Sequence, residues 1–255
     1  MKKAAQIALA VLVISGYSAL SHNGTSIALA KPTAQVGSSA AVKDIKTTSD
    51  LSRWMNYYYL HPQPDLTLTA VDYIQKNKLA TPDARNSLLA FFSQLIAQNP
   101  QRLPAWTEHF KSMNDGMKGI LWTAMWQANT PESKKQLVIF TKSLNSEMQK
   151  ATSKMSSPVA IEKMPIDGPA VLDRLWSCFC ATGKDKYVKR IIEVLPPPNT
   201  KRANEMMRAG AARWSLSSNA HQHKKVLAIC MQVRQQTSDP ILKKELTAVI
   251  EKAQK

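Results

Sequence analysis

The sequence predicts an all-α protein of antiparallel helix hairpins, stacked on one another as a short α-solenoid. Three observations support this class. Apolar residues recur with helical spacing along most of the chain, no stretch alternates with period two between turn signals, and one aromatic-to-turn pattern recurs. An irregular helical bundle is the alternative architecture, because its antiparallel hairpins would show the same local pattern.

The recurring pattern places a large aromatic residue two helical turns before a residue that closes a helix. The spacings between successive aromatic residues are 38, 30, 54 and 38, close to the periods of stacked repeats. The expected repeat core consists of Trp54, Phe92, Trp122, Trp176 and Trp214. The expected turn residues are His61, Asn99, Asn129, Gly183 and His221.

The clearest copy of the pattern is Arg174–Ile192, RLWSCFCATGKDKYVKRII, which predicts a helix to Gly183 and a second helix from near Lys184. This unit resembles the helix-turn-helix repeats of tetratricopeptide-like α-solenoids, although its spacing varies and the Gly and Tyr signature positions of that family are absent. Together with YYLHPQPD, NPQRLPAW and RWSLSSNAHQH, it is also similar to segments of uncharacterised exported bacterial proteins. This resemblance covers most of the chain after residue 48. It implies a helical repeat fold and carries no activity.

Residues 1–30 have the features of a secretory signal peptide. Lys2 and Lys3 precede an uncharged apolar run, and Ala28-Leu29-Ala30 is an A-x-A cleavage site. Cleavage after Ser18 and an uncleaved membrane anchor are the alternatives. Residues 31–46 are rich in Ala, Ser and Thr without periodicity, which predicts a disordered leader. We therefore expect one helical repeat domain over residues 47–255 and no transmembrane helix after processing.

Capping residues and prolines mark the expected helices of the first half. The helix behind residues 130–132 is expected to carry Leu137, Val138 and Phe140 as apolar residues. The other expected helices follow residues 48–50, span 65–77, follow Thr81-Pro82-Asp83, and span 101–113 and 117–128.

Serines, prolines and the lack of a helical period predict a mobile loop insertion at residues 150–169, with a lid as the alternative. After the central hairpin, Pro196-Pro197-Pro198 interrupts the chain, and Thr200 is expected to cap a helix to Ser218. The last expected helices are 224–235 and one opened by Asp239-Pro240. Core packing is the expected role of the three tyrosines at 57–59 and of the tryptophans, with a sugar-stacking platform as the alternative.

The chain carries a formal charge of +16, which becomes +14 without the two lysines of the signal peptide. A protein this basic is attracted to anionic envelope polymers and, electrostatically, to membrane surfaces. A solvated basic surface without a specific partner is the alternative. No nucleic-acid-binding motif appears in the sequence, so we expect no specific nucleic-acid binding.

Three cysteines in an oxidising compartment suggest one disulfide, and Cys180–Cys230 is the expected pair. Three small buried hydrophobic residues are the alternative. Cys178 and Cys180 with His221 and His223 form a weaker candidate site for copper or zinc.

The sequence contains no G-x-S-x-G, H-E-x-x-H or P-loop pattern. We therefore expect no enzymatic activity and no cofactor. The favoured function is an exported binding or scaffolding module, periplasmic or extracellular, for a protein or an anionic envelope polymer. The alternatives are a metal or redox protein that uses the cysteines with His221 and His223, and an enzyme with an unrecognised site.

Overall fold

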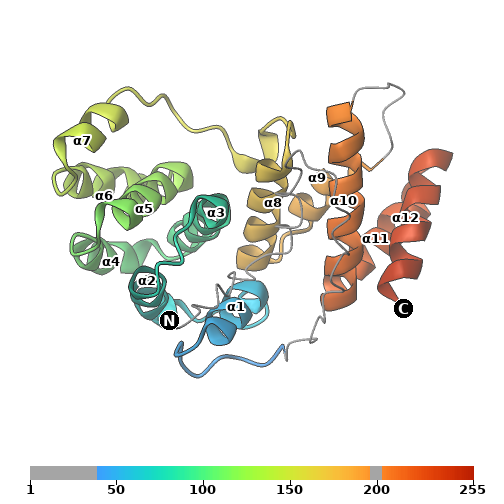
Figure 1. Ribbon diagram of the computed structural model, residues 1–255, viewed down its shortest axis with the longest axis horizontal. Coiled ribbons are helices and arrows are strands. Elements are labelled where there is room, and N and C mark those ends of the chain that lie inside the picture. The colour runs from blue at the N-terminus through green and yellow to red at the C-terminus, as the bar shows by residue number, and fades with distance from the viewer. Residues whose placement is uncertain (1–38, 196–202) are drawn as a thin grey trace, which may run out of the picture.

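The computed structural model describes residues 39–195 and 203–255, which form twelve α-helices, three short 3-10 helices and no strand (Figure 1). The all-α prediction is confirmed. The helices of the first half are α1 (Thr48–Tyr57), α2 (Thr67–Lys76), α3 (Pro82–Gln98), α4 (Leu103–Phe110), α5 (Asp115–Ala128), α6 (Pro131–Thr141) and α7 (Ser146–Thr152). Those of the second half are α8 (Pro169–Thr182), α9 (Asp185–Ile192), α10 (Ala203–Gln222), α11 (Lys224–Gln236) and α12 (Pro240–Ala253). The 3-10 helices are η1 (Pro64–Leu66), η2 (Pro100–Arg102) and η3 (Ile161–Lys163).

Helix α3 lies at the centre of the molecule, between α5 on one side and α8 on the other (Figure 1). In residues 87–93 its sequence is apolar or small on every face, and both Ala90 and Phe91 are buried although they point in different directions. A helix that is apolar all round must be enclosed by other helices. Phe91 belongs to the hydrophobic core of the first half, and Ala90 belongs to that of the second half. Helix α3 therefore joins the two cores.

Local capping chemistry sets several helix ends, as the sequence predicts. The side chains of Thr81, Thr130 and Asp239 accept hydrogen bonds from backbone N–H groups in the first turns of α3, α6 and α12. Asn129 and Gly183 end α5 and α8 in the left-handed conformation, with φ of 51° and 64°. These interactions join residues close in sequence, so they can be recognised without the tertiary structure.

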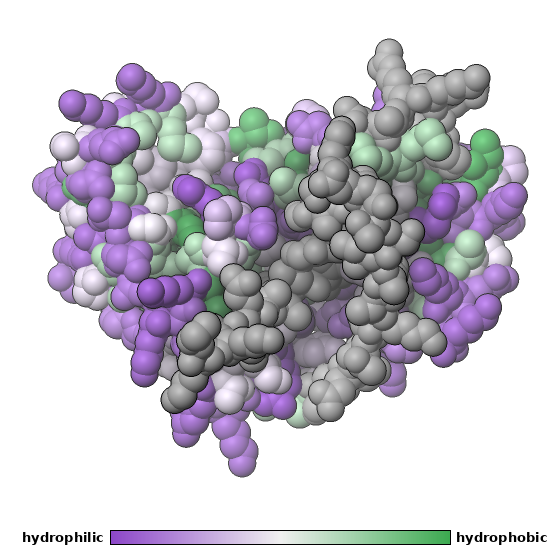
Figure 2. All heavy atoms as spheres, viewed as in Figure 1, coloured by the Kyte–Doolittle hydropathy of each residue, from purple (hydrophilic) through white to green (hydrophobic). Residues whose placement is uncertain are grey.

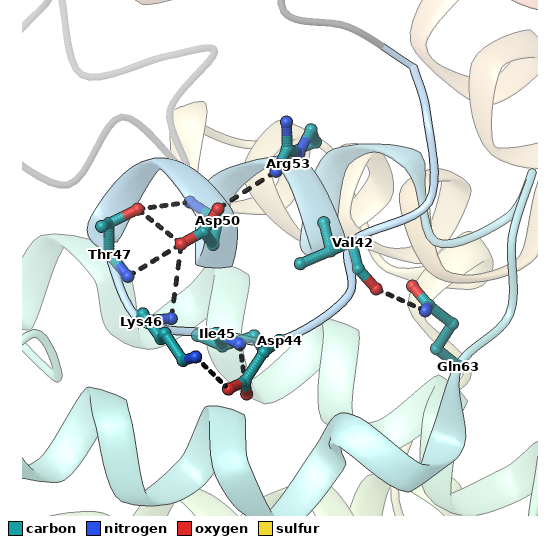
Figure 3. Close-up of polar contacts among 8 residues, drawn as sticks. All are labelled: Val42, Asp44, Ile45, Lys46, Thr47, Asp50, Arg53 and Gln63. Atoms are coloured by element: carbon teal, nitrogen blue, oxygen red, sulfur yellow. Dashed lines mark hydrogen bonds and ion pairs between the residues drawn. The ribbon is translucent and has the colours of Figure 1, made fainter.

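The leader prediction is wrong for the described residues next to α1, because Val42 and Ile45 are buried in the core of the first half. The Val42 carbonyl oxygen accepts a 2.6 Å hydrogen bond from Nε2 of Gln63. Thr47 and Asp50 then form a capping box at the start of α1 (Figure 3). Two apolar side chains in a polar segment are enough to attach it to the core.

The segment predicted as a mobile insertion is irregular but packed. Trp126 Nε1 donates to the carbonyl oxygen of Ser156 at 3.0 Å, and Gln127 Nε2 donates to that of Val159 at 2.8 Å. Further along, Ile161 and Ile166 are buried in the core of the second half. These contacts attach the segment at several points, but most of residues 151–160 are exposed, so the predicted mobility stays a prediction.

The repeat prediction is wrong for Trp214, which is 38% exposed, whereas the other four repeat-core aromatic residues are buried. The inward face of α10 is formed by Ala212, Leu216 and Ala220, spaced four residues apart. Trp214 lies two residues from Ala212 and so points to the opposite side of the helix. His221 is not a turn residue either, since α10 continues to Gln222.

The packing also joins helices that are distant in sequence, since α8 contacts both α1 and α3. In a regular stack each unit meets only its neighbours, so these contacts favour the irregular bundle for the first half. The predicted signal peptide at 1–30, the proline run at 196–198 and the Thr200 cap lie outside the described residues.

Candidate functional site

Four aromatic side chains meet where the C-terminal ends of α1 and α8 approach the turn between α10 and α11. We call this cluster the aromatic junction. It consists of Tyr57, Tyr59, Phe179 and His223. The ring centroids of Tyr57 and His223 are 4.9 Å apart, and those of Tyr59 and Phe179 are 5.0 Å apart. Tyr58 points the other way, into the core of the first half against Trp54.

The backbone holds the junction together as well. The N–H of Tyr59 donates a 2.9 Å hydrogen bond to the carbonyl oxygen of Cys180, which ties the end of α1 to the end of α8. Tyr59 also packs directly on Gly183, where an added Cβ atom would lie 2.8 Å from Tyr59 Cδ2. Only glycine combines the left-handed backbone of this turn with so close a neighbour.

His223 is the titratable group at the centre of the junction, and it is 2% exposed. Its Nδ1 lies 3.3 Å from the hydroxyl oxygen of Tyr59, and its Nε2 has no hydrogen-bond partner among the described residues. Burial lowers the pKa of His223 to about 4, so the imidazole is neutral at pH 7.

A phenol beside an imidazole is a pairing that enzymes use for proton transfer, but the electrostatics here oppose it. Burial raises the pKa of Tyr59 and of Tyr57 while it lowers that of His223, so each group is held in its neutral form. No described carboxylate forms a hydrogen bond or ion pair with the imidazole that would stabilise its charged form. The geometry is that of a structural contact between three segments.

The cysteines do not form the predicted Cys180–Cys230 disulfide, since Cys178, Cys180 and Cys230 are all free and buried. Cys180 lies at the end of α8 that meets α1, whereas Cys230 lies on α11, which packs against α9, α10 and α12. Burial raises the pKa of Cys180 and of Cys230 to about 12. The alternative prediction, three small buried hydrophobic residues, describes them correctly.

The candidate metal ligands also point apart. The Sγ atom of Cys178 lies 4.0 Å from the carbonyl oxygen of Ala90 on α3, and Nδ1 of His221 donates a 3.0 Å hydrogen bond to the carbonyl oxygen of Ala253. Within residues 39–195 and 203–255, no group of three or more potential ligands is placed to hold a metal ion. The predicted metal site is therefore not formed, because the fold does not bring Cys178, Cys180, His221 and His223 together.

Sequence reasoning missed the pairing of His223 with Tyr57 and Tyr59. Tyr59 and His223 are 164 residues apart, and no local pattern links them. One signal was present, since three consecutive tyrosines at a helix end cannot all face the same core.

Many hydrophilic residues lie at the surface toward both ends of the molecule (Figure 2), and some of the exposed lysines among the described residues form no ion pair. Some cations pair across helices, such as Arg213 with Glu245 at 2.5 Å and Lys225 with Asp185 at 3.2 Å. Other exposed lysines of α9 to α12 and their flanks form no ion pair with any described residue. These are Lys184, Lys224, Lys243, Lys244, Lys252 and Lys255.

Comparison of the chain with protein-family models, with curated proteins and with solved structures finds no match. In the described part of the chain, no helix combines the length and the apolar character needed to cross a membrane.

Proposed function

We propose that the protein is a non-enzymatic exported binding or scaffolding module for a protein or an anionic polymer of the bacterial envelope. The observation that carries the proposal is the set of exposed lysines without ion pairs. Unpaired surface cations create a positive potential that attracts anionic partners. Export rests on the signal-peptide features of residues 1–30.

The finer hypothesis of a short solenoid also belongs to this proposal. Two consecutive hairpins, α8–α9 and α10–α11, contact each other, and α12 packs against the second. This is the order that a stack of repeats would have, and stacked repeats present extended binding surfaces. The metal or redox alternative gains no support from the arrangement of the cysteines and histidines.

The test is a pull-down from bacterial envelope and spent-medium fractions with the purified protein, washed at low and then at high salt. We expect one stoichiometric partner to remain at high salt. A broad anionic mixture that is removed by salt would contradict the proposal, because it would show that the charge acts without specificity.

A further inference from the structure

The solvent side of α6 combines positive charge with exposed aliphatic side chains. Val138 is 66% exposed, the largest value among the exposed large hydrophobic residues of the described chain, and Ile139 beside it is also exposed. The sequence analysis named Val138 as one of the apolar residues of this helix, and the structure places its side chain at the surface. The solvent-facing side of α6 after Pro131, which we call the α6 face, consists of Lys134, Lys135, Val138, Ile139 and Lys142.

These five residues lie on one side of the helix. At 3.6 residues per turn they cover an arc of about 140°. The opposite side is buried, with Phe140 inside the core and its ring centroid 6.2 Å from that of Phe110. Trp122 Nε1 donates a 2.9 Å hydrogen bond to the hydroxyl of Thr141 at the end of the same helix. The α6 face is therefore presented by a firmly packed helix.

The positive charge of the α6 face is not compensated. Its three lysines form no ion pair with any described residue, unlike the half-buried Lys111, which pairs with Glu108 one turn away. The only acidic residue of α6 is Glu132, which lies outside the arc and accepts a 2.8 Å hydrogen bond from Gln136. A partner of opposite charge is the chemical complement of this surface.

The two aliphatic side chains distinguish an anionic lipid surface from an anionic polysaccharide. A hydrated polysaccharide can pair with the lysines but does not remove Val138 and Ile139 from water. The surface of an anionic bilayer does both, because its phosphates pair with the ammonium groups while the acyl boundary accepts the aliphatic side chains. Long lysine side chains reach the headgroups from a helix that lies in the plane of the interface.

We propose that the α6 face binds the surface of an anionic phospholipid membrane, with the helix axis parallel to that surface. This inference goes beyond the partner classes of the proposed function, because a lipid bilayer is neither a protein nor an anionic polymer. The three lysines supply the attraction to the headgroups, and the two aliphatic side chains enter the interface between them.

The experiment is co-sedimentation of the full chain with vesicles of equal parts phosphatidylcholine and phosphatidylglycerol, and with vesicles of phosphatidylcholine alone. The charge variant is Lys134→Gln/Lys135→Gln/Lys142→Gln. Each lysine near an anionic surface contributes about a fivefold increase in affinity, so this variant is expected to bind the mixed vesicles on the order of 100-fold more weakly. The apolar variant, Val138→Ser/Ile139→Ser, keeps the charge and is expected to lose about tenfold.

The matched control is Lys243→Gln/Lys244→Gln/Lys252→Gln, which removes the same charge from exposed positions of α12. We expect it to lose less than about fivefold, the contribution of one surface lysine. All substituted positions except Ile139 and Val138 carry solvated charges, and circular dichroism with urea unfolding establishes that each variant is folded.

Equal losses in the charge variant and the control would overturn the inference, because general charge would then explain binding. An unchanged affinity of the apolar variant would overturn it too, since no side chain would enter the interface. Binding to a soluble sulfated polysaccharide but not to mixed vesicles would refute the lipid partner and leave the proposed function standing. If the protein binds none of the vesicles, the polysaccharide and the envelope fractions, both the membrane inference and the proposed function are overturned.

Discussion

The contact between Tyr59 and Gly183 makes a quantitative prediction about Gly183→Ala. Gly183 ends α8 with φ of 64°, and its N–H donates a 2.6 Å hydrogen bond to the carbonyl oxygen of Phe179. An added Cβ atom would lie 2.8 Å from Cδ2 and 3.2 Å from Cβ of Tyr59. The neighbouring atoms include the Cβ of Tyr59, which cannot move by simple rotation of a side chain.

Two costs follow from this geometry. A residue with a Cβ atom costs about 1 kcal/mol or more in the left-handed conformation. Forcing a methyl group against a packed side chain costs about 1–3 kcal/mol. We therefore expect Gly183→Ala to lower the free energy of unfolding by about 2–4 kcal/mol. Removing the Tyr59 ring should relieve much of the second cost and leave the first.

The assay is urea unfolding at pH 7, followed by circular dichroism and tryptophan fluorescence, for each single variant and for Gly183→Ala with Tyr59→Ala. The control is Gly116→Ala in α5, where an added Cβ would lie 3.4 Å from its nearest neighbour, Oδ1 of Asn114. In the first turn of a helix this exchange should change the free energy of unfolding by less than about 1 kcal/mol, the value for a glycine in the middle of a helix. The reasoning fails if Gly183→Ala behaves like the control, or if its cost is the same with and without the Tyr59 side chain.

Three further predictions concern titration, thiols and packing. Burial lowers the pKa of His223 to about 4, so the unfolded chain binds this proton before the folded protein does as the pH falls from 7. The free energy of unfolding should therefore drop by about 3 kcal/mol between about pH 6.5 and pH 4. Burial with a second carboxylate nearby raises the pKa of Asp173 to about 6, so protonation of Asp173 stabilises the folded state as the pH falls over nearly the same range. The drop should therefore be measured in Asp173→Asn, and most of it should be lost when His223→Gln is added. All three thiols are buried, so an aromatic disulfide reagent should react with no thiol in the folded protein and with three thiols in denaturant. Reaction of only one thiol in denaturant would instead show that two cysteines form a disulfide. Trp176→Ser should lower the free energy of unfolding by about 3 kcal/mol or more because Trp176 is buried, whereas Trp214→Ser should lower it by less than about 1 kcal/mol. Similar effects of the two substitutions would show that Trp214 is a core residue after all.

The sequence by itself determined the helical class and several helix ends. Thr81 with Pro82 at the start of α3, and Gly183 at the end of α8, act through residues three or four positions away. Such interactions are complete within one turn of helix, so they can be identified from residue type and spacing. The same locality explains why Arg174–Ile192 was recognised as a helix, a turn and a helix.

The candidate metal ligands could be named from the sequence, but whether their side chains lie close together could not be predicted from it. Cys178 and His221 are suitable residue types, yet one faces α3 and the other the end of α12. Which way each points depends on how whole helices cross. The lysines of α6 were likewise visible as charges, but the exposure of Val138 between them was not, because an aliphatic residue on a helix usually marks the inner side.

Only the tertiary structure decided which helices are central. Helix α3 is enclosed because α5 and α8 pack on two sides of it. Tertiary contacts also bury Val42 and Ile45 of a polar segment and leave Trp214 at the surface. It also brings His223 to Tyr59 across 164 residues. The physical reason is that burial depends on contacts between distant segments, and amphipathic helices with similar patterns can satisfy it in more than one arrangement.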